Sequence, residues 1–162
     1  MVVTTPAPSA AAVESDRSYH ALRIGPVNGG SPTNPLWMAG VSNAALQDAL
    51  QTSLANLNLL AQPIGDARYV VTAELVDLDR PSVAKDPVIV FVPIDMSVSV
   101  RLHYKVAPTG GGQPVFDEVV ATTGTATGGQ SLVPDQRVRL ALETAVKANI
   151  VEFAARLRKQ WP

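Results

Sequence analysis

Cysteine is absent from this 162-residue chain, and histidine occurs only twice. The first absence excludes disulfides, thiolate nucleophiles and cysteine-ligated metals within the chain. Charge of either sign is also scarce, with 13 basic and 14 acidic residues and a net charge of −1. A near-neutral chain has no general electrostatic attraction to nucleic acid, so we expect no nucleic-acid partner. The hydrophobic content of 46% instead predicts a globular protein with its own core.

Long apolar runs are missing as well, since no stretch approaches the roughly 20 residues that span a bilayer. The first residues do not form the basic start and apolar core of an export signal. They read MVVTTPAPSAAAVESDRS, a composition rich in Pro, Ala, Ser and Thr that is typical of linkers. We therefore expect residues 1–18 to be a flexible N-terminal linker and residues 19–162 to form a single domain.

Hydrophobic periodicity divides the domain into four strands and two helices. The clearest strand runs from Asp95 to Val106, where alternating apolar and polar residues predict one buried and one solvated face. A helix should begin at Ser42 or Asn43, both good N-caps, and continue to about Asn58. The remaining elements are expected as strands at 19–27, 67–79 and 113–127, and as a final helix at about 135–159.

The order β-α-β-β-β-α indicates the fold class. Two amphipathic helices need an apolar sheet face, and the strand at 95–106 provides one. A glycine-rich turn at 109–112 joins this strand to the next as an antiparallel hairpin. We therefore expect an α+β fold, a two-layer sandwich with both helices on one face of a mostly antiparallel four-stranded sheet. The threonine-rich end of the fourth strand has little bulk and is interpreted as an edge or a bend.

No combination of residues in the chain indicates a reaction. His20 and His103 lack companion ligands at a metal-binding spacing, so we expect no metal site. Residues Ser82 to Lys85 match an SxxK pattern, but the companion motifs of that enzyme class are missing. The glycine-rich stretches are not phosphate-binding loops between a strand and a helix. We therefore expect that the protein is not an enzyme and has no cofactor and no catalytic residues.

A row of basic side chains is the first candidate binding surface. It consists of Arg101, His103 and Lys105 on the solvated side of the strand at 95–106. Such a row is usually only a solvated face. Its functional interpretation is a site for an acidic partner or for lipid headgroups. The sequence leaves both interpretations open.

The window VIVFVPI at residues 88–94 is the second candidate surface. Uncharged, β-prone windows are normally buried or used for pairing, because their exposure risks aggregation. Pro93 argues against a central strand. Two alternatives remain, namely burial in the core and an edge strand that pairs with an envelope protein or a second copy. The candidate residues are Val88, Val90, Phe91 and Val92.

The final helix contains residues with expected structural roles. Arg137 and Arg139 oppose the helix dipole and so need acidic partners. Asp135, or Glu143 at four residues from Arg139, could supply one, and a carboxylate elsewhere in the fold is the other alternative. Asn149 falls near the apolar stripe of the helix. We expect it to hydrogen-bond the loop before the first helix or a strand end.

The segment TNPLWMAGVSN at residues 33–43 contains Pro35 and Trp37. No polar or charged cluster accompanies the indole, so a ligand site is the weaker interpretation. We interpret Pro35 and Trp37 as a structural clasp that packs over an end of the core and aims the helix that follows.

Three motifs carry a resemblance to a known family. They are N-P-x-W-x(3)-V-S/G-N at residues 34–43, a strand ending L-x-x-L-x-x-P at 75–81, and R-x-A-x-E-x-A-x-x-x-N-I at 139–150. The chain resembles small, uncharacterised proteobacterial lipoproteins of the outer membrane and periplasm over most of residues 20–157. Its architecture is also similar to that of lipopolysaccharide-assembly and transport-auxiliary lipoproteins, which work as binding or assembly partners.

The resemblance implies an exported protein that is acylated on a cysteine and held at the inner face of the outer membrane. This chain departs from the family because it lacks both the export signal and the cysteine. We expect a preceding segment to supply them, which would give periplasmic localisation and contact with the membrane surface through a native lipid anchor.

The leading functional prediction is therefore a non-catalytic periplasmic domain, lipid-tethered in its native form, that binds a protein or another envelope component. The alternative is a carrier of a small apolar ligand or lipid between the helices and the sheet. A deep apolar cavity would favour the carrier. An exposed edge and a packed core would favour the binding domain.

Overall fold

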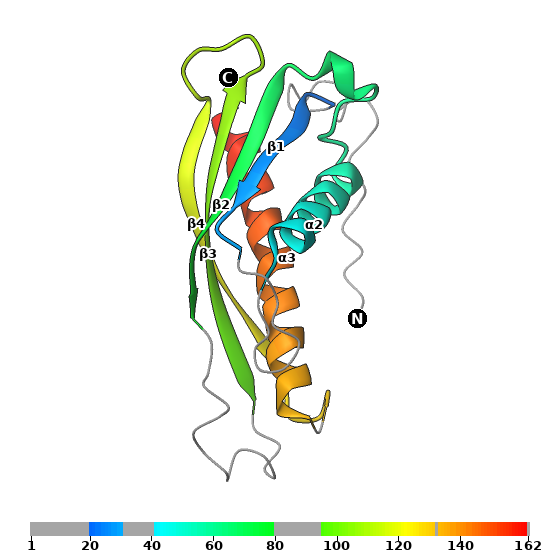
Figure 1. The fold of residues 1–162 in the computed structure, drawn as a ribbon, viewed down its shortest axis with the longest axis vertical. Helices are drawn as coiled ribbons and strands as arrows, with labels where there is room; N and C mark the ends of the chain where they lie inside the picture. The colour runs from blue at the N-terminus through cyan, green and yellow to red at the C-terminus, as the bar shows by residue number, and fades with distance from the viewer. Residues whose placement is uncertain (1–19, 31–40, 80–94, 132, 162) are drawn as a thin grey trace, which may run out of the picture.

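The computed structural model describes residues 20–30, 41–79, 95–131 and 133–161. The predicted order β-α-β-β-β-α is confirmed, and the predicted linker at 1–18 lies outside the described residues. The elements shown in Figure 1 are β1 (Leu22–Asn28), α2 (Asn43–Asn56), a short 3-10 helix η1 (Ile64–Asp66), β2 (Tyr69–Asp79), β3 (Met96–Pro108), β4 (Phe116–Ala126) and α3 (Pro134–Gln160).

The four strands form one mixed sheet in the order β1-β2-β3-β4. β2, β3 and β4 are antiparallel neighbours, whereas β1 lies parallel to β2 with Leu22 opposite Tyr69. The parallel pair follows from α2, because a helix between two strands returns the chain to the same end of the sheet. The sheet is therefore mostly antiparallel, as predicted.

β3 alternates between a buried and a solvated face, as its sequence predicts. The side chains between the buried ones are exposed or half-buried, so the far face of the sheet is open to solvent. The buried residues of this strand are Met96, Val98, Val100, Leu102, Tyr104 and Val106.

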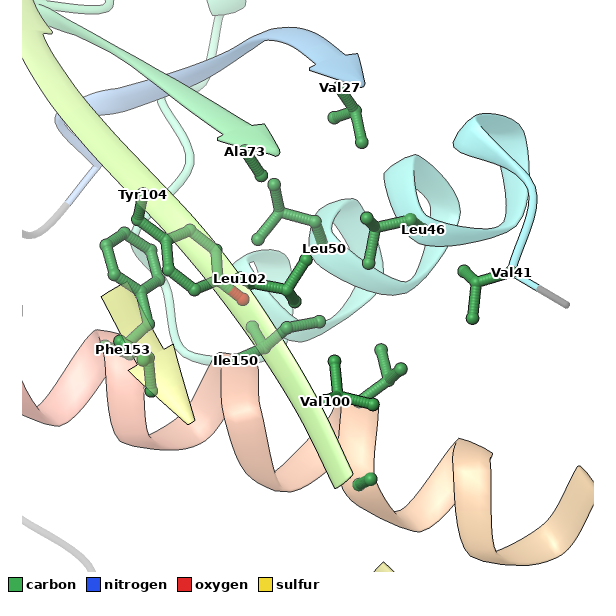
Figure 2. Packing of buried hydrophobic residues seen from close by; sticks show 14 of the residues in the cluster. Val27, Val41, Leu46, Leu50, Ala73, Val100, Leu102, Tyr104, Ile150 and Phe153 are labelled. Atoms are coloured by element: carbon green, nitrogen blue, oxygen red, sulfur yellow. The ribbon is translucent and has the colours of Figure 1, made fainter. Parts of the chain in front are cut away.

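Both helices cover the same face of the sheet (Figure 1). α3 crosses β3 and β4, while α2 packs on β1 and against α3. Figure 2 shows Leu50 of α2 and Ile150 of α3 among the buried side chains that fill the space over the sheet. Deeper along α3, the ring of Phe153 stacks on Tyr104 with ring centroids 4.1 Å apart. The core is therefore continuous between the two layers.

α2 begins where the sequence predicts, since the Ser42 hydroxyl oxygen accepts a hydrogen bond from the Ala45 N–H at 3.1 Å. The helix ends at Asn56, slightly before the predicted end near Asn58. The reason is the backbone of Asn58, whose φ of 57° is left-handed and stops a helix.

β4 is an edge strand rather than a bend, because its register with β3 continues without a shift over its whole length. The small residues of β4 allow α3 to pack closely on this strand. A Cβ atom on Gly124 would lie 2.1 Å from the Ala141 carbonyl oxygen, so the helix backbone packs directly on the strand. The Thr122 hydroxyl also donates a hydrogen bond to the Ala145 carbonyl at 2.8 Å.

Candidate interaction surface

The basic row predicted on β3 lies on the open face of the sheet with acidic residues beside it. Asp77 of β2 lies opposite Arg101, and Asp117 of β4 lies opposite Lys105. His103 has Glu74 as its neighbour on β2. With three acids beside Arg101 and Lys105, the described residues form no positive patch on this face. The geometry therefore favours a solvated face over a site for acidic partners or lipid headgroups.

Three pairs of polar side chains on the open face bond across β3 and β4. Nε2 of His103 lies 2.6 Å from Oδ1 of Asp117, with both side chains partly exposed. An ion pair this exposed contributes little to stability. Hydroxyl pairs between β3 and β4 continue the row, namely Ser97 with Thr125 at 3.0 Å and Ser99 with Thr123 at 2.8 Å. The described part of this face therefore presents bonded polar groups rather than a reactive cluster.

The sheet has two edges, and the edge formed by β1 is covered. The N–H groups of Ala21 and Leu22 donate to the Leu59 carbonyl at 3.0 and 2.9 Å. The Ala61 N–H donates to the Leu22 carbonyl at 2.8 Å. Farther along β1, the register with β2 shifts, and the shifted stretch contains Pro26, which has no N–H to offer. A further strand could pair with β1 only poorly.

β4 forms the other edge and has none of these features. It is 11 residues long, contains no proline and no basic residue, and its only neighbour among the described strands is β3. Figure 1 shows it as the outer strand of the sheet, with α3 packed on its inner face rather than along its edge. An edge of this kind is a template for pairing with another chain.

The register of the sheet shows which backbone groups of β4 point outward. The Thr109 N–H donates to the Arg68 carbonyl at 2.8 Å, so Tyr69 and Pro108 form a pair without mutual hydrogen bonds. Along β3 from this pair, the backbone N–H and C=O groups of one residue bond to β2 and those of the next residue bond to β4, in strict alternation. The residues of β4 whose N–H and C=O point away from β3 are then Asp117, Val119, Ala121, Thr123 and Thr125.

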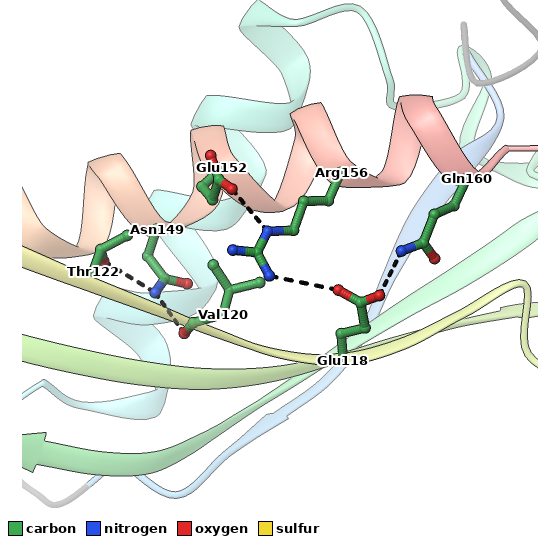
Figure 3. A network of polar contacts seen from close by, with 7 residues as sticks. All are labelled: Glu118, Val120, Thr122, Asn149, Glu152, Arg156 and Gln160. Carbon is green, nitrogen blue, oxygen red and sulfur yellow. Dashed lines mark hydrogen bonds and ion pairs between the residues drawn. The ribbon is translucent and has the colours of Figure 1, made fainter.

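The inner face of β4 is fixed by Asn149 of α3, which is fully buried. Its Nδ2 donates to the Val120 carbonyl at 2.8 Å and to the Thr122 hydroxyl at 3.0 Å (Figure 3). Its Oδ1 accepts a hydrogen bond from the Tyr104 hydroxyl at 2.9 Å. Burial raises the pKa of Tyr104, which keeps this hydroxyl protonated as a donor. The partners of Asn149 are mid-strand groups, so the predicted loop or strand-end partner is wrong.

Glu118, on the inner face of β4, bonds side chains from the C-terminal part of α3. Arg156 lies 3.6 Å from Glu118 and donates from Nε to Glu152 at 2.7 Å (Figure 3). The Gln160 amide also donates to Glu118. The hydrogen bond from Arg156 to Glu152 raises the pKa of the arginine. These contacts tie β4 to α3 and leave its outer backbone edge unused.

The two arginines at the start of α3 differ in their surroundings. Arg139 forms the expected ion pair with Glu143, with Nε 3.3 Å from Oε1. Arg137 is 1% exposed, and its Nε and Nη2 atoms have no hydrogen-bond partner. Neither Asp135 nor Glu143 bonds the Nε or Nη2 atom of Arg137, so the prediction of an acidic partner for Arg137 is wrong for these two atoms.

Other predicted sites lie outside the described ranges and stay predictions. In the ranges that are described, no group of three or more acidic or histidine side chains is placed to hold a metal ion. No helix in the same ranges is long and apolar enough to cross a membrane. The undescribed candidates are Pro35, Trp37, Val88, Val90, Phe91 and Val92.

Comparison of the sequence with protein-family models and with curated proteins finds no match. Solved structures do share the fold. The hypothetical protein CT253 from Chlamydia trachomatis is 11% identical, with 88% of this chain and 97% of that chain covered and a TM-score of 0.57. Protein XCC0632 from Xanthomonas campestris, of the DUF330 family, is 9% identical, with 86% and 84% covered and a TM-score of 0.57.

A minor lipoprotein from Acinetobacter baumannii is also among the similar structures. It is 6% identical, with 87% of this chain and 92% of that chain covered and a TM-score of 0.49. Identities this low show likeness of fold alone. The function must therefore be argued from the surfaces of this chain.

Proposed function

We propose that this chain is a non-catalytic domain of the bacterial cell envelope that binds another protein by pairing a strand with β4. The open outer edge of β4 carries the proposal. Alternate residues along its 11-residue length present N–H and C=O groups that no described strand pairs. Such groups bind an extended segment of a partner through main-chain hydrogen bonds. The periplasmic location and the native lipid tether rest on the motif resemblance to exported lipoproteins.

The side chains beside this edge indicate what a partner strand would contain. Val119 is 41% exposed, and the hydroxyls of Thr123 and Thr125 follow it on the same face. Cross-strand pairs favour β-branched and hydroxyl side chains opposite such residues. Asp117 at the start of the row favours a basic residue opposite it. A partner segment of this pattern would extend the sheet without burying an unpaired charge.

Core packing supports surface binding over the alternative of an internal carrier. Tyr104 and Phe153 stack in the space between β3 and α3, and Leu50 and Ile150 fill the space nearer α2 (Figure 2). These side chains are at most 1% exposed. A lipid carried between the layers would have to displace close-packed side chains, which is costly.

Replacement of Ala121 by proline tests the role of the edge. The Ala121 N–H points outward, so Ala121→Pro should remove a donor for the partner while changing the free energy of unfolding by at most about 1 kcal/mol. Ala121→Ser keeps the donor and serves as the matched control. We expect Ala121→Pro, but not Ala121→Ser, to abolish partner binding at this edge.

A photo-crosslinking residue placed in the exported chain in living cells provides the measurement. Position Val119 on β4 and position Val76 on β2 are both exposed valines of the described sheet, with 41% and 51% exposure. We expect a discrete adduct from Val119 that Ala121→Pro removes, and none from Val76. An adduct that persists in Ala121→Pro, or that forms equally at Val76, would contradict binding at the β4 edge.

A further inference from the structure

The first turns of α3 contain a buried arginine, Arg137, with two side-chain nitrogen atoms that have no hydrogen-bond partner. Arg137 is 1% exposed, yet its Nε and Nη2 atoms are buried without a hydrogen-bond partner. A guanidinium group is a planar cation with five N–H donors. A buried charge without compensation is strongly unfavourable and is rarely retained without a reason. The missing partner is therefore the informative feature.

The two unpaired atoms define the shape of that partner. Nε and Nη2 lie on the same edge of the planar guanidinium, and their N–H groups point in the same direction. This edge is the fork that binds two oxygens of one carboxylate or phosphate group. A single carbonyl or a water molecule would satisfy only part of it. The geometry of the vacant donors thus selects an oxyanion with two adjacent oxygens.

The start of α3 adds to the attraction for an anion. Val133, at the N-cap position, provides no side-chain hydrogen bond, so the amides of the first turn lack a side-chain cap. The positive end of the helix dipole lies at the same place. Side chains of a helix tilt toward its N-terminus, so the Arg137 side chain is expected to lean toward this turn. Asp135, the acid of this turn, is exposed and does not bond Nε or Nη2.

We infer that the N-terminal end of α3 is an oxyanion-binding site in which Arg137 holds a phosphate or carboxylate group through its Nε and Nη2 atoms. The inference is independent of strand addition at β4, because Arg137 belongs to α3 and its vacant donors belong to no contact of that strand. Arg139 provides an internal contrast, since its side chain is 75% exposed and pairs with Glu143.

Thermal unfolding of the full chain with inorganic phosphate tests the site. We expect phosphate at about ten times its Kd to raise the Tm by about 3 °C relative to chloride at the same ionic strength. Arg137→Met should abolish this increase and should raise the Tm in chloride, because it removes a buried charge without a partner. Arg139→Met is the matched control and should keep the full phosphate response.

An equal phosphate response in Arg137→Met would overturn the inference, as would the absence of any response in the parent chain. If Arg137→Met does not fold, the arginine Nε–H resonances of the parent chain provide a second measurement, with Arg137→Lys used to assign the Arg137 signal. Phosphate should shift that signal and leave the Arg139 signal in place. A shift of both signals, or of neither, would again count against the site.

Vesicles distinguish the two sources of the phosphate group. If the natural ligand is a lipid headgroup, the chain should co-sediment with phosphatidylglycerol vesicles and not with phosphatidylcholine vesicles, and Arg137→Met should weaken this binding at least about tenfold. If the natural ligand is a free anion, phosphate should shift the Tm and both vesicle types should stay unbound. Vesicle binding that is identical in Arg137→Met and Arg139→Met would contradict the lipid source.

Discussion

β1 and β4 are the two edges of one sheet, and they are stabilised in opposite ways. β1 is held from outside, where backbone groups of residues 59–61 bond its first residues. β4 is held from inside, where Asn149, Glu118 and Gly124 connect it to α3. The outer side of β1 is therefore occupied, whereas the outer side of β4 is free in the described structure.

The difference bears on function because proteins usually protect exposed strand edges. Prolines, bulges, short strands and covering segments are the common devices. β1 uses three of them, with Pro26, a register shift and the cover by residues 59–61. β4 uses none, although it is the longer strand. This contrast, seen in the described residues, supports the proposal that the β4 edge pairs with a partner.

The largest effect is expected where α3 touches β4 most closely. Gly124→Val would place a branched side chain where even a Cβ atom lies 2.1 Å from the Ala141 carbonyl oxygen. Helix and strand would have to separate, at a cost of at least about 3 kcal/mol in the free energy of unfolding. Gly129→Val is the control, since a Cβ atom there meets nothing within 4 Å. Urea denaturation of both variants measures the difference, and equal midpoints would contradict the close contact.

A somewhat smaller effect is expected from Asn149→Leu, which has a similar side-chain volume. It leaves the buried Tyr104 hydroxyl without its acceptor, at a cost of about 2–3 kcal/mol. Adding Tyr104→Phe removes the unpaired hydroxyl and should recover about 1 kcal/mol of that loss. A double-mutant cycle measured by chemical denaturation tests the coupling. Strictly additive losses would show that Tyr104 of β3 and Asn149 of α3 do not stabilise each other across the core.

The smallest effect is expected on the open face. Asp117→Asn removes the charge that pairs with His103, but both side chains are partly exposed. We expect a loss below about 0.5 kcal/mol in the free energy of unfolding at pH 7. A loss above about 1.5 kcal/mol would mean that the open face of β4 contributes to stability as much as its inner face does. It would contradict the view that β4 is held mainly by its contacts with α3.

Local patterns were sufficient to predict much of the fold. The alternation along β3, the Ser42 cap of α2 and the apolar stripe of α3 each depend on residues close in sequence. They led to the correct order of elements and to one buried sheet face. The i to i+4 pair of Arg139 and Glu143 was predictable for the same reason.

The proposed interaction surface at β4 depends on contacts between distant residues, which local patterns do not show. The sequence indicated residues 88–94 as either a pairing edge or part of the core, and because they lie outside the described ranges this stays a prediction. Sequence reasoning gave Asn149 the wrong partners, because nothing local shows that Val120 and Thr122 face it across the layers. Gly124 within a strand was an available signal, since such a glycine often marks the close approach of another backbone. Which backbone approaches Gly124 could be known only once the position of α3 was known.

The bonds of Asn149 have a further consequence for the uniqueness of the folded state. The segment VVATTGTA in β4 is small and repetitive, so its own side chains discriminate poorly between neighbouring alignments on β3. A slip of one residue would turn Gly124 away from α3 and bring a threonine under the helix. A slip of two residues would take Thr122 away from the Asn149 amide. One buried carboxamide and one glycine thus select a single alignment for the strand whose outer edge no described strand pairs.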